Sequence, residues 1–149
     1  MSVKIDLRAF TIKQPWAWAI AHAGKTIENR DWRTYQRGTI AIHAGAAWHW
    51  DRQLPRGIAQ PDDSEIHFSA IIAIADLVDC VDHARSKWFG GPFGFVLDNI
   101  RPLKKPVPCK GALSFWHVPS TQVNAIRRQL SAKDNLWIPL HDYRTEDQG

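Results

Sequence analysis

The alternation of polar and apolar residues over positions 8–13 predicts a short strand. A run rich in helix formers follows it. Pro15 suits the first turn of that helix, because a residue there needs no N–H for the helical hydrogen bonds, and Gly24 is placed to end the helix. The chain is therefore expected to leave the helix at a defined point, directly before a cluster of charged residues.

The charged segment at residues 25–30 predicts a second strand. Successive side chains of a strand point to opposite faces, so Thr26, Glu28 and Arg30 are expected to share one face. By the same count Lys25 falls on the other face, but it lies at the junction with the helix, where the alternation is a weaker guide.

The next part of the chain predicts further strands, in short apolar or alternating runs: 38–45, 68–80, 93–100 and 112–119. The run at 68–80 is too continuously apolar for a strand with one wet face, so it is predicted to be the most buried strand. Residues 46–54 suggest a turn of helix. Residues 102–111, interrupted by prolines, suggest an edge connection.

A second helix is predicted over 120–132, with a hydroxyl cap at Ser120 or Thr121 and apolar residues at helical spacing. The polar tail at 142–149 is expected to fray. Strands without regular helix alternation favour the α+β class, as a small, mostly antiparallel β-barrel with flanking α-helices. We expect residues 1–149 to form a single domain.

Composition narrows the setting of this domain. The 149 residues are 44% hydrophobic, and no apolar run approaches the ~20 residues of a transmembrane helix, so no membrane span is expected. The first residues lack the apolar core of a signal peptide, which favours a cytoplasmic protein. Cys80 and Cys109 have no disulfide or zinc spacing, and the seven histidines show no metal-binding pattern. We expect no metal and no cofactor.

The net charge of +4 is a mild tilt toward anionic partners. The eight tryptophans are a sharper feature, because several must pack in the core while others are free to stack on nucleic-acid bases.

Several segments together carry a resemblance to a known family. The opening run "IKQPWAWAIAHAGKTIENRDWRTYQRGTIAIHAG", the buried "AIIAIADLVDC" and the closing "WFGGPFGFVLDNIRPLKKPVPCKGALSFWHVP" resemble ASCH (activating signal cointegrator homology) domains of bacterial and phage type, which belong to the PUA-like superfamily. The family pattern is G-x-K-x-x-E-x-R. Lys25, Glu28 and Arg30 hold its last three places, whereas Gly24 stands next to the lysine rather than two positions before it.

This resemblance implies a PUA-like barrel with a cleft between the barrel and the first helix, lined by Lys25, Glu28 and Arg30. It implies binding of single-stranded RNA or of a modified nucleoside in that cleft, with a role in RNA metabolism. Two alternatives stay open. The first is a hydrolase, either a metal-independent ribonuclease or an amidohydrolase acting on N4-acetylcytidine. The second is a protein-interaction module of a transcription or translation regulator.

A hydrolytic role needs catalytic groups. Lys25 beside Arg30, together with Glu28, could serve as base and electrostatic stabiliser. The resemblance to the PUA-like superfamily also implies a position for the nucleophile: in its acetylcytidine-hydrolysing branch, the attacking threonine stands two positions before the motif arginine. Here that place is held by Glu28, so Thr26 or a water activated by Glu28 would have to substitute.

Further residues are candidates for contacts to the ligand: Gln14, Trp16, Trp32, Arg33, His43 and Ser114. Gln14 and Trp16 match the family's "QPW" start and would lie at the rim of the cleft, although packing of Trp16 between helix and barrel is an alternative. His43 ends a strand that would face the cleft. Ser114 interrupts an apolar strand, where its hydroxyl would bond to backbone or to ligand.

The loop at residues 83–91 combines basic and aromatic side chains with two glycines. Two interpretations stand side by side. Lys87, Trp88 and Phe89 would close over a single-stranded ligand, or the two aromatic rings would plug the open end of the barrel.

Overall fold

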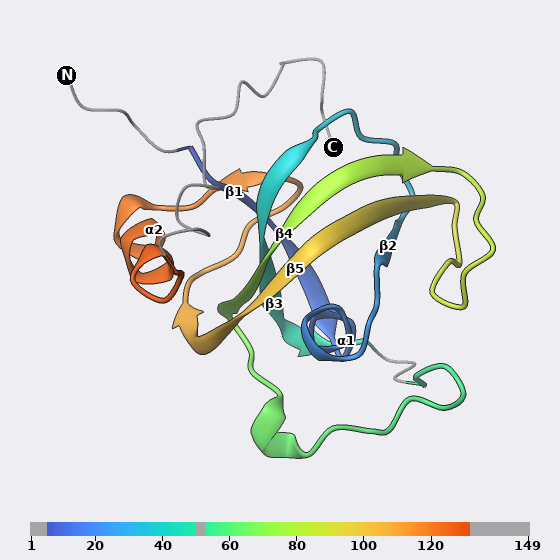
Figure 1. Ribbon diagram of the computed structural model, residues 1–149, viewed down its shortest axis with the longest axis horizontal. Coiled ribbons are helices and arrows are strands. Elements are labelled where there is room, and N and C mark those ends of the chain that lie inside the picture. Colours follow the sequence, from blue (N-terminus) through green and yellow to red (C-terminus); the bar gives the residue numbers. More distant parts are fainter. Residues whose placement is uncertain (1–5, 50–52, 132–149) are drawn as a thin grey trace.

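The computed structural model describes residues 6–49 and 53–131 (Figure 1). Its elements along the chain are β1 (Arg8–Gln14), α1 (Trp16–His22), β2 (Ile27–Arg30), β3 (Gly38–Trp48), the 3₁₀ helix η1 (Asp63–Glu65), β4 (Ala70–Val81), β5 (Phe93–Pro108), β6 (Trp116–His117) and α2 (Ser120–Arg127). The predicted tail at 142–149 lies outside the described residues. Within the described ranges no helix is long and apolar enough to cross a membrane.

The strands form one six-stranded sheet in the order β2-β5-β4-β3-β1-β6. All neighbouring pairs are antiparallel except β1 and β3, which run parallel. The predicted α+β class and mostly antiparallel sheet are confirmed. In the described residues the sheet is not closed into a barrel, because β2 and β6 form its two edges and are only four and two residues long. Figure 1 shows the strands curving around α1 without closing.

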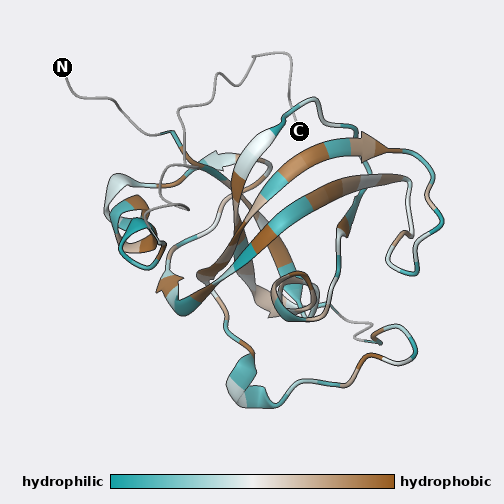
Figure 2. Cartoon of the chain, in the orientation of Figure 1, coloured by the Kyte–Doolittle hydropathy of each residue, from teal (hydrophilic) through white to brown (hydrophobic). Residues whose placement is uncertain are grey.

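The two helices lie in separate cores on the sheet. Apolar residues of α1 pack with alternate residues of β1 and β3, such as Ile12 and Ile42. The residues between them, such as Ala9 and Ala41, pack on the other side with Val123 of α2. The alternation of a strand therefore gives the central strands two buried faces. In Figure 2 much of β4 is accordingly brown, for hydrophobic.

The predicted buried strand at 68–80 corresponds to β4. Its residues Ala70 to Ala75 are all buried, and it lies between β3 and β5 in the middle of the sheet. The expectation that this run forms a buried strand is confirmed.

The predicted turn of helix at 46–54 is wrong, since β3 continues to Trp48. Backbone pairing beyond the reach of local pattern extends it: Trp48 lies opposite Gln14 of β1, and the His49 N–H donates to the Gln14 carbonyl at 2.7 Å. Gly45 permits this close approach of β1, because a Cβ there would lie 3.0 Å from Thr11 Cγ2. Residues 50–52 lie outside the described residues.

The predicted edge connection at 102–111 is also wrong over most of its length, because β5 runs unbroken to Pro108. Its pairing with β4 shifts register three times, which is the kind of irregular strand that tolerates proline. β2 pairs only with the first residues of β5, up to Val96. Farther along β5, the Gln129 side chain hydrogen-bonds the backbone N–H and carbonyl of Lys105, both at 2.8 Å.

The last elements are shorter than predicted. The strand expected at 112–119 is reduced to β6, since Ser114 has a positive φ of 57° and the chain bends there. The helix expected over 120–132 ends at Arg127. Its N-cap is Pro119, with no side-chain cap, so the hydroxyl cap predicted at the next two residues is wrong. The helical spacing is confirmed by the burial of Val123 and Ile126.

Candidate functional site

The first helix sets the entry to the site. The Gln14 side chain accepts a hydrogen bond from the Trp18 N–H and donates one to the His67 carbonyl, both at 2.8 Å, which anchors the start of α1. At its other end Gly24 has a φ of +76°, which suits glycine, and the Lys25 N–H donates back to the Ala19 carbonyl at 3.1 Å. This turn brings Lys25 under the helix rather than out into solvent.

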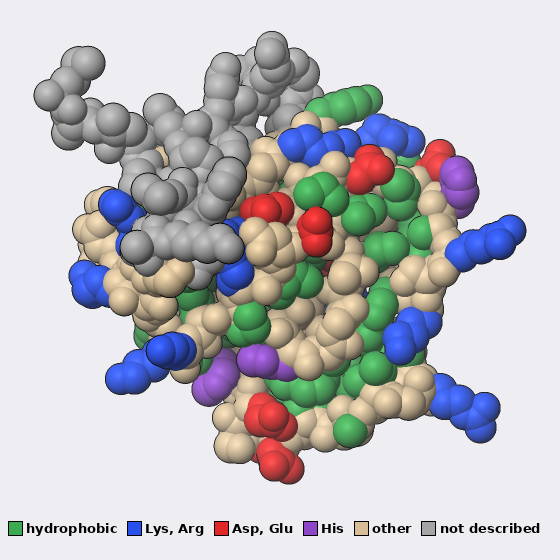
Figure 3. Space-filling view, viewed as in Figure 1, with side chains coloured by type: hydrophobic (Ala, Val, Ile, Leu, Met, Phe, Trp, Pro, Cys, Tyr) green, Lys and Arg blue, Asp and Glu red, His purple; other side chains and the backbone are tan. Residues whose placement is uncertain are grey.

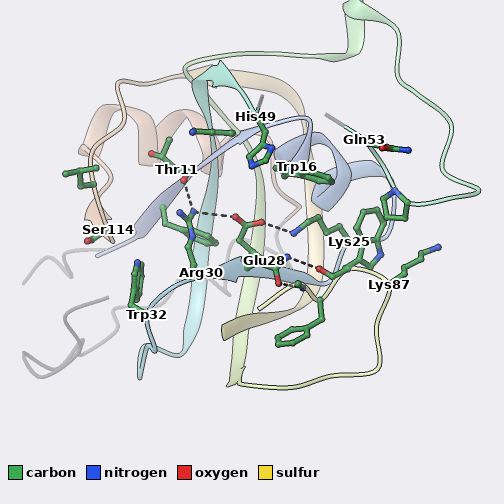
Figure 4. Close-up of a pocket in the computed structure, with 18 of the residues that line it drawn as sticks. Thr11, Trp16, Lys25, Glu28, Arg30, Trp32, His49, Gln53, Lys87 and Ser114 are labelled. Carbon is green, nitrogen blue, oxygen red and sulfur yellow. Dashed lines mark hydrogen bonds and ion pairs between the residues drawn. The ribbon is translucent and has the colours of Figure 1, made fainter. Parts of the chain in front are cut away.

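Lys25, Glu28 and Arg30 lie together, as the motif predicted. The Lys25 ammonium donates to Glu28 Oε1 at 2.7 Å and also to the Ile27 carbonyl. Arg30 lies 3.6 Å from Glu28 Oε2 and donates to the Thr11 carbonyl at 2.8 Å. Figure 4 shows the line of contacts from Thr11 through Arg30 and Glu28 to Lys25. We call Lys25, Glu28 and Arg30 the charged cluster.

Burial makes this cluster unlike a surface ion pair. Lys25 is 2% exposed and Glu28 is 7% exposed. Two buried charges lose much of their hydration, so each is stable there only because the other is present. Arg30 is half-buried, and its guanidinium lies 5.2 Å from the centre of the Phe10 ring.

Strand alternation explains two members of the cluster and not the third. Glu28 and Arg30 share a face of β2, as predicted. Lys25 joins them although the count placed it on the opposite face, because it precedes β2 and does not have strand conformation. Thr26 is exposed and is not among the residues that line the pocket; its carbonyl accepts a hydrogen bond from the Leu97 N–H at 2.8 Å.

The charged cluster opens into a pocket of about 880 Å³. Its walls include parts of β1, α1, β2, the loop at 83–91 and the segment before β6. Besides the charged cluster, the lining residues include Phe10, Thr11, Lys13, Trp16, Asn29, Trp32, Lys87, Trp88, Phe89 and Ser114. We call this space the basic pocket. It lies beside α1, as the resemblance implied for the cleft.

Tryptophans form part of the pocket wall. Trp16 is half-buried, with the Lys25 ammonium 6.0 Å from its ring centre and His49 edge-on at 5.9 Å. Trp32 is half-buried and packs edge-on against Phe95 at 4.9 Å. Each ring is therefore held by packing while part of its surface faces solvent. Figure 4 places Trp16 above the charged cluster and Trp32 on the side of Arg30 away from Lys25.

The 83–91 loop forms another wall and is held by Asn29. The Asn29 amide donates to the Trp88 carbonyl at 2.9 Å and accepts from the N–H groups of Gly90 and Gly91 at 2.8 and 3.2 Å. Trp88 is buried, whereas Lys87 is exposed at the pocket. Trp88 therefore packs inward, whereas Lys87 lines the pocket with its side chain exposed.

Sequence reasoning missed Asn29 and Thr11. By strand alternation Asn29 falls on the face of β2 opposite to Glu28 and Arg30, which does not point to a contact with the 83–91 loop. The alternation of the first strand was visible, but nothing local indicated that the Thr11 carbonyl would lie against Arg30. Both contacts join segments far apart along the chain.

His43 does not line the basic pocket. It is 1% exposed, its Nε2 lies 2.6 Å from the Cys109 carbonyl oxygen, and its Nδ1 lies 3.1 Å from Thr11 Oγ1. Burial lowers the pKa of His43 below its ordinary value, although the hydrogen bond to Cys109 opposes this. As a neutral ring it donates from Nε2 to Cys109 and accepts from the Thr11 hydroxyl. His43 contacts the pocket-lining residue Thr11 through this hydrogen bond.

Of the other predicted ligand contacts, Ser114 lines the pocket, whereas Arg33 and Gln14 lie outside it. Ser114 lines the basic pocket, exposed and at its positive φ. Arg33 does not line it: the guanidinium lies 3.6 Å from Asp82 and 4.9 Å from the centre of the Phe93 ring. Gln14 is fully buried and is likewise outside the pocket. Within residues 6–49 and 53–131, no three His, Cys, Asp or Glu side chains come together as a metal site.

Comparison with known proteins shows which proteins this chain resembles in sequence and fold. No family model matches the chain. Human activating signal cointegrator 1 is 24% identical over 127 residues, a match that covers 74% of this chain and 22% of that protein. The chain thus spans less than a quarter of that curated relative.

A solved structure is similar in fold. The crystal structure of ASCH from Zymomonas mobilis has a TM-score of 0.51 and 14% sequence identity, and the match covers 86% of this chain and 98% of that one. The chain has the fold of an ASCH domain. A serine-to-alanine mutant of the same Zymomonas protein also has a TM-score of 0.51, with 85% of this chain and 98% of that chain covered. The ASCH resemblance indicated by the sequence is confirmed.

Proposed function

We propose that this chain binds single-stranded RNA in the basic pocket. The observation that carries the proposal is the combination of cationic side chains and half-exposed tryptophans in one concave space of about 880 Å³. The relatives named for ASCH support it, because the ASCH and PUA-like folds are associated with RNA binding.

The physical argument rests on two kinds of contact. Lysine and arginine side chains attract phosphate groups through charge-assisted hydrogen bonds. Aromatic rings stack on unpaired bases, which a single strand exposes and a duplex hides. Trp16 and Trp32 offer such rings near Arg30, so one bound nucleotide would meet both kinds of contact.

Titration of a labelled single-stranded RNA, followed by fluorescence anisotropy, tests the proposal. We expect the wild type to bind, with an affinity that falls as salt rises, because binding releases counterions from the RNA. Arg30→Gln should weaken binding roughly tenfold, the worth of one lost charge-assisted contact. Lys104→Gln is the matched control, since Lys104 is exposed on β5 and is not among the residues that line the pocket.

Two results would overturn this proposal. One is a wild-type protein that does not raise the anisotropy of the labelled RNA at low salt. The other is equal weakening by Arg30→Gln and Lys104→Gln, which would mean that RNA binds to overall positive charge rather than to the pocket. Arg30 is preferred to Lys25 as the probe because loss of the buried Lys25 charge also destabilises the fold.

RNA cleavage is a second candidate, favoured by the presence of a carboxylate, a guanidinium and a hydroxyl in one pocket, from Glu28, Arg30 and Ser114. Glu28 would act as the base that takes the proton of the attacking RNA 2′-hydroxyl, and Arg30 would stabilise the negative charge on the phosphoryl oxygens. Deacetylation of N4-acetylcytidine has less support, because Thr26 is outside the pocket. Incubation with RNA in EDTA, read on a denaturing gel, separates the two outcomes: intact RNA means binding alone, and cleavage lost in Glu28→Gln means catalysis.

A further inference from the structure

The charges of the basic pocket do not balance. Among the described residues that line it, four are cationic (Lys13, Lys25, Arg30 and Lys87) and one, Glu28, is acidic. Lys25 and Glu28 neutralise each other at 2.7 Å and are buried together. The remaining three positive charges face a space that aromatic rings also line.

The two exposed lysines are available to a ligand. Neither Lys13 nor Lys87 makes an ion pair within the described part of the chain. Lys87 lies 5.7 Å from the centre of the Trp88 ring, so its position is biased by that contact while its charge stays uncompensated. Both side chains are exposed at the pocket.

Arg30 has unused donors on the same wall. One of its terminal nitrogens is occupied by the Thr11 carbonyl and Glu28, whereas Nε is buried without a hydrogen-bond partner among the described residues. Nε has almost no accessible surface, so a ligand oxygen can accept from it only after a shift of the guanidinium. Lys13 lies two positions after Thr11 on β1, and both residues line the pocket.

From this distribution we infer that the basic pocket recognises a phosphorylated nucleotide rather than an uncharged nucleoside. The phosphate lies at Arg30 and Lys13, and the base stacks on the tryptophan wall. Lys87, on the opposite side of the charged cluster in Figure 4, attracts the neighbouring phosphate of a longer strand. This inference rests on the proposed function and adds the chemical class of the ligand to it.

The test uses the labelled RNA of the previous experiment and displaces it with uridine, uridine 5′-monophosphate, adenosine, adenosine 5′-monophosphate or inorganic phosphate. We expect each monophosphate to displace RNA at roughly tenfold lower concentration than its nucleoside, because the charge-assisted hydrogen bonds to phosphate are absent in the nucleoside. Lys13→Gln should reduce the difference in displacing concentration between monophosphate and nucleoside, and Lys104→Gln should leave that difference unchanged. Inorganic phosphate alone should displace RNA less well than either monophosphate, because it cannot stack.

The outcomes separate the inference from the proposed function. If nucleosides and monophosphates displace RNA equally, or neither displaces it up to millimolar concentration, the inference is wrong while RNA binding stands. Inorganic phosphate as effective as the monophosphates also overturns it, because the base then contributes nothing. If RNA itself does not bind, the proposed function fails first.

Discussion

Removal of the Lys25 charge is expected to destabilise the protein strongly. In Lys25→Met the methionine has similar length but no charge, so Glu28 is left buried without its partner at 2.7 Å. Breaking one side of a buried ion pair costs roughly 3–5 kcal/mol. Arg30 remains 3.6 Å from Glu28 and compensates in part, so the lower end, about 3 kcal/mol, is the expected loss in the free energy of unfolding.

Denaturant unfolding followed by tryptophan fluorescence measures this loss, and a thermal scan should show a decrease of roughly 9 °C in Tm. Lys13→Met is the matched control, because Lys13 is an exposed lysine of the same pocket and its loss should change stability by less than about 0.5 kcal/mol. The double variant Lys25→Met, Glu28→Gln should recover part of the stability, since it removes the isolated carboxylate charge.

The reasoning is refuted if Lys25→Met is as stable as Lys13→Met. It is also refuted if the losses of the two single variants simply add in the double variant, because residues in direct contact should show an interaction energy. Either result would mean that the cluster is effectively solvated and not a buried, coupled pair.

Two further predictions concern the pocket wall and the histidine behind it. Asn29→Ala removes three hydrogen bonds to the 83–91 loop, and denaturant unfolding should show a stability loss of about 1–2 kcal/mol. Asn124→Ala, on the exposed side of α2, is the control and should change stability little. Equal effects of the two variants would contradict the role given to Asn29. Burial gives His43 a pKa below the 6.5 of an exposed histidine, so as pH falls this side chain is protonated in the unfolded chain before it is protonated in the folded one. The contribution of neutral His43 to the free energy of unfolding is therefore full above pH 6.5 and is lost as pH falls toward the lowered pKa. Unfolding of His43→Asn across this range should show a smaller acid-side decline than the wild type or the exposed-site control His67→Asn; an unchanged decline would refute it.

The sequence predicted the elements that local pattern determines. β1, α1 and the buried β4 follow from alternation, from a helix bounded by Pro15 and Gly24, and from a continuous apolar run. The motif also identified the charged cluster. Each of these features can be recognised within a short stretch of residues, so tertiary contacts did not need to be known.

The errors arose where distant segments decide the structure. β3 extends past Gly45 because β1 pairs with it, which no property of residues 46–48 reveals. β5 passes through its prolines because its register with β4 shifts. His43 was expected to face the cleft, but packing against Trp116 and Cys109 holds it behind Thr11. Strand alternation predicts the face of the strand on which a side chain lies, but it does not predict which other segments pack against that face.

Photocrosslinking tests most directly whether the basic pocket is the RNA site. A single-stranded RNA carrying one photoreactive uridine would be crosslinked to the wild type and the attachment site mapped by mass spectrometry. We predict attachment at pocket residues, foremost Trp16, Trp32 or Lys87, and its loss in Arg30→Gln. Attachment instead at the exposed basic side chains of β5 and α2, with the pocket unmodified, would contradict the account. On the face of the molecule seen in Figure 3, basic side chains also lie around α2, so this surface is the alternative binding site that the experiment tests.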